Sequence, residues 1–551
     1  MSPPGSNQRA PLLWLVLPLA GGIAASGWWS PGTGLFPWLL GGAVLLAIAA
    51  AWAGMNDGRT PRGAWAFLLG GAAALAGLVH VQARSPRLAG WEDRPAREVR
   101  VQVKVARLFA LRPETKMLQG LGVITAAPEH LPELQGLRVY FSTIRKANTA
   151  LPARNGICVL RGVVSPAPRR AARSGFEDYL ANLGVAAQLQ RAFVEAEVAP
   201  PGPLDRLAAR AEKRFADMLR SGMESHPALQ SIHLAMLLGE KAALAPDQEA
   251  AFMRSGTFHV FSVSGLHVGV IATAIQSLLL LLRAPRALRA GLGLAALWFY
   301  VLVVGANPPA VRAFIMVAFL LARGLFGLPG NPLAALSAAA LVTLLLDPRQ
   351  LFSSGFQLSY LVVGAIVLMG LPLSALWQDW WRPFAHLPEA DWGWWRRAMR
   401  WSGRKVLGAT AITIAALLGS MPATIAFFGL FTPVGLLANL IVLPLASLAI
   451  IAGFVSILIG STGVAAGSVL FNHAAAVLIL VMDWLVRLGT ALPLAWLPAG
   501  YRAPWLEPAL IAAPLALMLL GAQLRWRNSA GGYWLPAAGV TLLLLACVRL
   551  G

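Results

Sequence analysis

The sequence contains few cysteines and few charged residues for its length. Cys158 and Cys547 are the only two thiols among 551 residues, so neither an intramolecular disulfide framework nor a cysteine-ligated zinc site is predicted. Charged residues make up 13% of the chain, against about 25% in an average soluble domain. P-loop, HExxH, EF-hand and GxSxG patterns are also missing. We therefore predict no metal or cofactor site, and any directional transport would need an external motor.

Apolar residues form long continuous blocks, and they account for 57% of the chain. Blocks of about 18–25 residues are long enough to cross a hydrocarbon core of about 30 Å as helices. Continuous rather than alternating blocks indicate helices and not a barrel. We therefore predict a polytopic α-helical membrane protein with roughly a dozen transmembrane helices. The predicted spans are residues 12–28, 36–52, 64–81, 259–282, 287–304, 310–325, 332–346, 354–373, 406–428, 433–459, 466–488, 503–520 and 533–548.

A polar segment, residues 84–200, follows the first three spans. Apolar and polar residues alternate in it, as in EVRVQVKVARLFAL (residues 98–111), and this period of two predicts half-buried strands of a small barrel or sandwich. The segment holds about 18 Lys and Arg against about 10 Asp and Glu. One strand combines two aromatic and two basic residues, the mixture found in single-strand binding grooves, although such aromatics are often core residues instead. These candidate DNA contacts are Tyr140, Phe141, Arg145 and Lys146.

Basic residues exceed acidic ones by 45 to 24, which gives a net charge of +21. Cytoplasmic loops of any membrane protein collect Lys and Arg, so part of this excess reflects orientation in the membrane. The remainder suits an anionic partner, either nucleic acid or acidic lipid. Residues 201–256 are predicted to connect the polar domain to the later spans, with an amphipathic helix over residues 204–220. The Trp- and Arg-rich residues 377–405 are typical of a membrane interface, where lipid phosphates are favoured over DNA as the partner.

Polar residues inside apolar blocks are costly, and they gather in a few places. His259, Ser264 and His267 lie at the start of one predicted span, where Ser264 and His267 would share a helix face. A packing seam with hydrogen-bonded hydroxyls is the alternative explanation. Arg312 follows the helix-breaking pair Pro308 and Pro309, and it either reaches the interface or lines a polar path. Two amides, Gln357 and Asn439, could instead hydrogen-bond between helices.

Six segments resemble the ComEC family of competence DNA-uptake channels. They are SGFEDYLANLGV (174–185), LLGEKAAL (237–244), SGTFHVFSVSGLHVGVI (255–271), NPPAVRAFIM (307–316), DPRQLFSSGFQLSYLVVGAI (347–366) and LLANLIVLPL (436–445). The resemblance implies leading helices in residues 1–83, an extracytoplasmic OB-like domain in residues 84–200 and a channel domain in residues 257–551. It also implies an inner-membrane channel for single-stranded DNA, with an extracytoplasmic DNA receptor and a cytoplasmic helicase-like motor as partners.

The resemblance places the first five of the following residues near the DNA path, and we predict the same for Asn439. The residues are His259, Ser264, His267, Arg312, Gln357 and Asn439. Many members of the family continue into a metallo-β-lactamase-like domain with an HxHxDH metal cluster. This sequence has no such cluster before Gly551, so neither nuclease activity nor any other enzymatic activity is expected of it.

Two other functions are compatible with the sequence. A transporter of small solutes or lipids would also use broken helices and a basic belt, but it would have no use for a basic domain of about 100 residues. Ser264 and His267 could form a hydrolytic dyad within the membrane, although no third group to orient the imidazole is evident.

Overall fold

The computed structural model describes residues 11–29, 33–55, 63–84, 94–109, 117–144, 152–167, 175–241, 244–327, 331–389, 392–523 and 534–550. Three apolar helices open it, α1 (Leu13–Ala25), α2 (Phe36–Met55) and α3 (Ala64–Ala83). Helices α1 and α3 approach so closely that a Cβ atom on Gly22 would overlap the carbonyl group of Ala74. Most large side chains of α2 are exposed, as expected for a helix that faces lipid.

Five strands then form a closed barrel. They are β1 (Arg97–Leu108), β2 (Met117–Ala126), β3 (Arg138–Ile144), β4 (Ile157–Pro166) and β5 (Ala187–Ala199). Their order around the barrel is β1-β2-β3-β5-β4, and only the β3–β5 pair is parallel. The alternating sequence pattern predicts such strands, and in β1 every second residue from Val99 to Val105 is indeed buried in the barrel core. Helix α4 (Gly175–Asn182) lies between β4 and β5 in the chain, and the strand arrangement is compatible with an OB-like barrel.

Three helices connect the barrel to the rest of the chain. Helix α5 (Pro203–Arg220) is the amphipathic helix predicted from the sequence, and α7 (Pro246–Arg254) is short and polar. The helix between them, α6 (Pro227–Leu238), was not predicted: every residue from Ser231 to Leu238 is buried. Its 12 residues are too few to cross a bilayer, so hydropathy alone does not single it out.

The remaining elements are mostly apolar helices. They are α8 (Gly265–Leu281), α9 (Arg286–Val303), α10 (Pro308–Phe326), α11 (Pro332–Leu346), α12 (Ser354–Ala365), α13 (Leu371–Trp380), α14 (Trp394–Phe428), α15 (Gly435–Ser461), α16 (Ala465–Thr490), α17 (Glu507–Gln523) and α18 (Trp534–Cys547). The 3-10 turns η6 (Phe258–Phe261) and η7 (Pro348–Phe352) precede α8 and α12, and the π-helical turn η8 (Ile366–Gly370) joins α12 to α13. Short strands β6 (Leu430–Phe431), β7 (Leu497–Tyr501) and β8 (Val548–Leu550) pair in one small antiparallel sheet.

Each predicted span contains a helix. Eight helices among the described residues are long and apolar enough to cross a membrane, and other apolar helices have only 10–17 residues. These features are those of a mostly helical membrane protein, as predicted. Two helices begin at some distance from the start of the predicted spans. Helix α8 begins at Gly265 and not at residue 259, because Ser262 and Ser264 are extended. Helix α14 begins at Trp394 and not at residue 406, because its Trp- and Arg-rich start is also helical.

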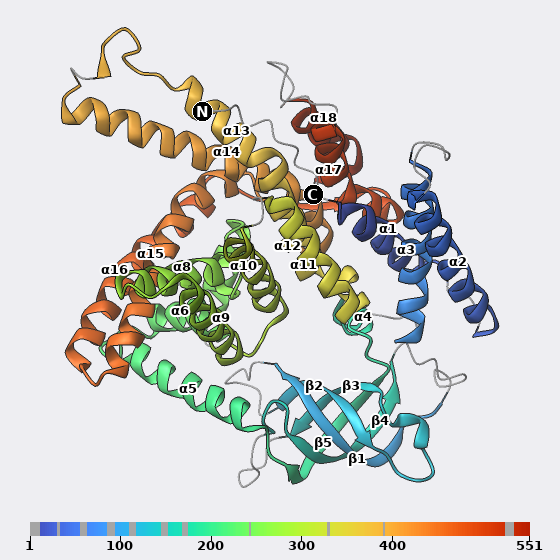
Figure 1. The fold of residues 1–551 in the computed structure, drawn as a ribbon. Helices are drawn as coiled ribbons and strands as arrows, with labels where there is room; N and C mark the ends of the chain where they lie inside the picture. The colour runs from blue at the N-terminus through green and yellow to red at the C-terminus, as the bar shows by residue number, and fades with distance from the viewer. Residues whose placement is uncertain are drawn as a thin grey trace.

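The barrel and the α13–α14 hairpin lie at opposite ends of the molecule (Figure 1). The barrel is at the lower right of that view, and α5 leads from it towards α15 and α16 on the left. Helices α6, α8, α9 and α10 lie between these elements and share one buried core with α15 and α16. A second core joins α1 to α11, α12 and α14. The helices α8, α10 and α12, which carry the predicted polar residues, therefore lie inside the helical domain.

Candidate anion site at three helix N-termini

Helix α8 begins with a reciprocal contact between a serine and a histidine. Ser264 is the N-cap residue, and its Oγ lies 3.1 Å from Nδ1 of His267. The backbone N–H of Ser264 is also directed at that nitrogen, at 3.4 Å. His267 therefore takes the place that Glu or Gln has in a capping box. Its side chain is fully buried, so the predicted proximity of the two residues is confirmed and belongs to the start of a helix.

Helix α10 begins after a sharp break in the chain. Gly305 and Ala306 both have positive φ angles, of 84° and 44°, a conformation that is unfavourable for alanine. Asn307 then caps the helix, and its side-chain amide donates a hydrogen bond to the Val304 carbonyl at 2.9 Å. Pro308 occupies the first turn, where its missing N–H costs no hydrogen bond.

Arg312 lies one turn into α10 and is only 2% exposed. Its Nη2 donates a hydrogen bond to the carbonyl oxygen of Gly355 at 2.6 Å. Its Nε and Nη1 are buried and have no hydrogen-bond partner among the described residues. A side chain this buried does not reach the surface of the protein, and the place of Arg312 beside a DNA path stays a prediction.

The acceptor of this hydrogen bond lies at the start of α12. Ser353 caps that helix by accepting a hydrogen bond from the Phe356 N–H at 3.2 Å. A Cβ atom on Gly355 would lie 3.3 Å from Nη2 of Arg312, so glycine allows the close approach. Gln357 donates a hydrogen bond to the Leu351 carbonyl at 2.9 Å, while its own side-chain oxygen is buried without a partner among the described residues.

These three helix starts meet at the first turns of α10. An ideal Cβ on Gly265 at the start of α8 would lie 4.0 Å from the Cβ of Ala313, and one on Gly355 of α12 would lie 3.9 Å from Pro309. Each helix N-terminus carries the equivalent of roughly half a positive charge, although Pro308 and Pro309 supply no N–H and Ser264 and Ser353 cap part of the other two starts. Together with the Arg312 guanidinium, they form a strongly positive site that is suited to an anion.

One predicted residue, His259, and one residue that was not predicted, Lys241, lie near the start of α8 but outside it. His259 is in η6, and its side chain is exposed although the next two residues, Val260 and Phe261, are fully buried. The ammonium group of Lys241, a residue for which no role was predicted, lies 4.9 Å from the ring centre of Phe258. Its position after the glycine that ends α6 gave no signal in the hydropathy pattern.

Asn439 lies in a different polar cluster, in the first turns of α15. An ideal Cβ on Gly435 would lie 3.9 Å from Nδ2 of Asn439 and 3.4 Å from the carbonyl oxygen of Ser255. The Ser255 hydroxyl in turn lies 2.6 Å from that of Thr257. The oxygen of the Asn439 amide is buried without a partner among the described residues. This residue therefore borders the α7–η6 segment and does not take part in the contact between Arg312 and Gly355.

The aromatic residues proposed for DNA contact in the barrel require a correction. Phe141 is fully buried in the barrel core. Tyr140 is 7% exposed and packs under α4, with its ring centre 5.5 Å from that of Phe176. Neither ring is free to stack on a base in this structure, because α4 covers the outer face of β3. Arg145 and Lys146 lie outside the described residues.

The barrel is attached to the segment that leads into α12. Nη1 of Arg138 in β3 lies 3.3 Å from Oδ2 of Asp347, and it also donates a hydrogen bond to the Leu183 carbonyl at 2.8 Å. Asp347 caps η7 by accepting a hydrogen bond from the Arg349 N–H at 3.2 Å. A second contact joins Asn155 to Asp205 of α5 at 3.0 Å. The positive site therefore lies a few residues from the point where the barrel docks.

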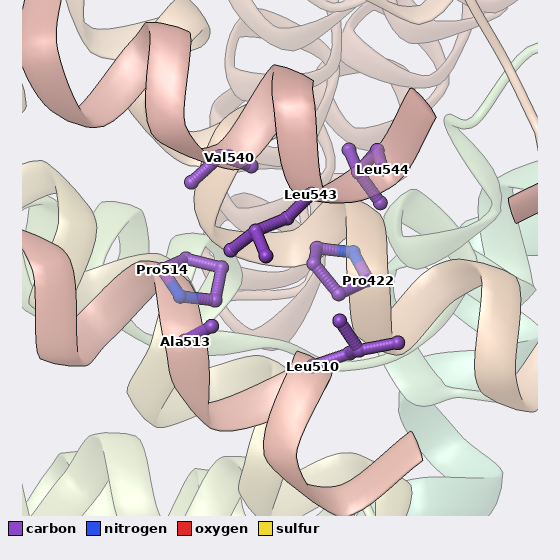
Figure 2. Close-up of a pocket in the computed structure, with 7 residues that line it drawn as sticks. All are labelled: Pro422, Leu510, Ala513, Pro514, Val540, Leu543 and Leu544. Carbon is purple, nitrogen blue, oxygen red and sulfur yellow. The ribbon is translucent and has the colours of Figure 1, made fainter. Parts of the chain in front are cut away.

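The described residues offer no obvious alternative site. They contain no group of three His, Cys, Asp or Glu residues that could hold a metal ion. Figure 2 shows a hollow between α14, α17 and α18 that is lined only by apolar residues, among them Pro422 and Pro514. The Ser264–His267 pair has no carboxylate partner among the described residues, and the imidazole nitrogen that faces Ser264 also faces a backbone N–H. Such a pair is better suited to starting a helix than to activating a nucleophile.

Comparison with known proteins identifies the family. The competence protein family model matches residues 236–528, which is more than half of the chain. ComE operon protein 3 of Bacillus subtilis (strain 168) is 26% identical over 257 residues, which cover 46% of this chain and 29% of that protein. Competence protein ComA of Neisseria gonorrhoeae is 33% identical over 144 residues, covering 24% of this chain and 20% of that protein. A protein of Aquifex aeolicus (strain VF5) is 34% identical over 143 residues, covering 26% and 33%.

The chain thus matches about a third or less of the length of these curated relatives. No solved structure matches it. The family match covers every helix from α8 to α17, and it therefore includes all three helix starts of the anion site. The chain belongs to the competence protein family, and the resemblance to ComEC that its motifs suggest is confirmed.

Proposed function

We propose that this protein is an inner-membrane channel that carries single-stranded DNA into the cytoplasm during natural transformation. The family match supports a role in competence DNA uptake. The observation that carries the finer proposal is the meeting of three helix N-termini at Arg312. This buried guanidinium has two nitrogens without partners among the described residues.

A phosphate chain is the ligand that best satisfies such a site. A buried charge is costly unless it is paired, and each DNA phosphate offers oxygen acceptors to a guanidinium and to helix N–H groups. Because phosphates are the same in every nucleotide, contacts of this kind carry no sequence information. Uptake through this site should therefore be insensitive to DNA sequence.

The location of the site supports the same proposal. Asp347, which the barrel contacts through Arg138, is followed within eight residues by Gly355, the acceptor of the Arg312 hydrogen bond. A strand that leaves the barrel at this junction would meet the positive helix starts next. We propose that the barrel is OB-like and binds the strand before it enters the helices, as such barrels commonly do.

We propose an orientation with the barrel outside the cytoplasm. The α13–α14 hairpin at the opposite end of the molecule (Figure 1) contains six Lys and Arg residues between residues 377 and 405, and clusters of this kind stay on the cytoplasmic side. In this orientation an extracytoplasmic receptor would deliver DNA to the barrel. A helicase-like motor on the other side would supply the energy.

The other polar residues receive separate roles in this proposal. Arg312, Gln357 and the exposed His259 are proposed to line the path. The buried His267 and the half-buried Ser264 are proposed to hold the start of α8 in position, and Asn439 to fix the α7–η6 segment beside it.

Two measurements test the proposal. Cells that lack this protein should fail to take up labelled DNA, and the full chain should restore uptake. The purified full chain in lipid nanodiscs should bind single-stranded DNA with an affinity that falls steeply with salt, because each neutralised phosphate releases counterions. Normal uptake without the protein, or binding that does not respond to salt, would instead favour a transporter of small solutes or lipids.

A further inference from the structure

The hairpin formed by α13 and the first part of α14 combines exposed tryptophans with basic residues. Four of its tryptophans have large exposed fractions: Trp380 (75%), Trp394 (82%), Trp395 (48%) and Trp401 (66%). Arg382, Arg397 and Lys405 are exposed beside them. Large exposed aromatic surfaces are unfavourable in water, so we expect a binding partner to cover this surface.

The two arms of the hairpin are packed firmly together. The backbone of Gly403 in α14 touches the Trp381 indole so closely that a Cβ atom there would overlap the ring. Gln378 donates a hydrogen bond to Ser374 at 2.8 Å, and an ideal Cβ on Gly408 would lie only 3.0 Å from the Ser374 hydroxyl. The exposed tryptophans are therefore held by an ordered scaffold.

Arg396 and Lys405 lie against aromatic rings and not against acids, whereas Arg400 and Arg404 pair with Glu389 and Asp379. The Arg396 guanidinium lies 5.1 Å from the centre of the Trp395 ring and 5.6 Å from that of Phe384. The Lys405 ammonium lies 5.9 Å from the ring of Trp401. Cations paired with indole rings keep their positive charge available to an external anion.

The length of α14 places this hairpin at the membrane surface. The helix has 35 residues, about 52 Å at 1.5 Å per residue, whereas about 20 residues cross the hydrocarbon core. The apolar part begins near Val406, so the 12 residues from Trp394 to Lys405 extend about 18 Å beyond it. The headgroup layer on each side is only about 5–8 Å thick, and this segment must pass through it.

We propose that the α13–α14 hairpin is a binding site for anionic phospholipid headgroups, with its tryptophans inserted among them and its arginines on their phosphates. Indole rings prefer the headgroup level, and basic side chains there are attracted to anionic lipid. The exposed tryptophans lie on both arms, and Trp395 lies about 100° around α14 from the face that Trp394 and Trp401 share, which suits a surrounding lipid layer better than one flat protein partner. This proposal does not depend on DNA transport.

The hairpin lies at the far end of the helix that starts at the anion site. Helices α12 and α13 with η8 form one continuous run of 27 residues, Ser354–Trp380. Gly355, the acceptor of the Arg312 hydrogen bond, lies at its first turn, and Trp380 lies at its last residue. Headgroup binding at the hairpin would therefore fix one end of the helix whose other end completes the site.

A fluorescent label on the hairpin tests its position. Ser402 is exposed in the same segment of α14, and the two cysteines can be replaced first (C158A and C547S). We expect a polarity-sensitive dye on S402C to be quenched by lipids that carry a spin label in the headgroup region. In vesicles of phosphatidylcholine alone this quenching should be weaker than in vesicles that also contain phosphatidylglycerol. Quenching by aqueous iodide alone in both vesicles would overturn the proposal.

Charge removal tests the partner. The triple variant R396Q/R397Q/K405Q should bind phosphatidylglycerol at least about tenfold more weakly by native mass spectrometry, since each basic residue near an anionic surface contributes about fivefold. The matched control R206Q/R210Q/R214Q removes three arginines from α5 and should retain binding. Equal losses in both variants would contradict a site at the hairpin. Crosslinking of S402C in cells to another protein rather than to lipid would overturn the proposal as well.

Discussion

Replacement of Arg312 by methionine separates a transport role from a structural one. The wild-type residue is 2% exposed, makes one hydrogen bond to Gly355 and leaves two nitrogens without partners among the described residues. Methionine has a similar length and fills most of the same space. The protein should therefore lose little packing, in contrast to the cavity that alanine would leave.

The expected change in stability follows from two opposing contributions. Loss of a hydrogen bond that involves a charged group costs about 1.5–3 kcal/mol. Removal of an incompletely paired buried charge returns several kcal/mol of desolvation cost. We therefore expect R312M to reach the membrane in normal amounts, with an unfolding temperature at or above that of the wild type. DNA uptake should fall by at least about tenfold, because a lost charged contact to phosphate is worth at least about 1.4 kcal/mol.

The assay combines uptake of labelled DNA with a blot of membrane protein. R323Q, near the other end of α10, is the matched control, and it should take up DNA normally. R312K should recover part of the activity, since it restores the charge without the planar guanidinium. Normal uptake by R312M would refute the assignment of Arg312 to the path. Loss of the protein itself in R312M would show that the residue serves the fold.

Three further changes have defined outcomes. E212Q should raise thermal stability above pH 7 and flatten its pH dependence. Burial, and then the nearby charge of Glu240, raise the Glu212 pKa from 4.5 to about 7. The stability that the neutral acid contributes is therefore complete below pH 4.5 and is lost as the pH rises through 7. Thermal unfolding across that range measures it, and an unchanged slope would contradict it. G22A should lower the yield of folded protein in detergent, because its Cβ would overlap the Ala74 carbonyl. S264A should weaken the start of α8 by about 1 kcal/mol, and neither it nor the wild type should react with a fluorophosphonate. A labelled wild type would revive the hydrolase hypothesis.

The sequence predicts the helices better than it predicts their contacts. Continuous apolar blocks predict the spans well, because a backbone segment in lipid must satisfy its own hydrogen bonds and such a block does so as a helix. Helix α6 was not predicted, because the predictions were based on the length of apolar blocks and a short helix buried in protein need not be as long as a membrane span. The π-helical turn η8 was also not predicted, since Ile366–Gly370 has the composition of an ordinary apolar helix.

The candidate site shows the same limit. The residue types pointed to His259, Ser264, His267 and Arg312, because polar groups in apolar blocks are costly. The sequence does not reveal that Arg312 bonds to a backbone carbonyl 43 positions away. In the barrel, alternation predicted the strands, but five successive residues of β3 are buried. Helix α4, which comes later in the chain, covers the outer face of β3, and the local sequence of β3 does not indicate this contact.

The unbroken helix from Ser354 to Trp380 makes bilayer thickness a variable for this protein. Its 27 residues span about 40 Å, whereas the hydrocarbon core is about 30 Å thick. A thinner hydrocarbon core, as formed by shorter acyl chains, favours a larger tilt of such a helix. Tilting about a hairpin held at one surface would swing Gly355 sideways at the other, and a hydrogen bond of 2.6 Å tolerates little sideways movement. Cells whose membranes contain short acyl chains would then hold the Arg312 contact in a different geometry from cells with long ones.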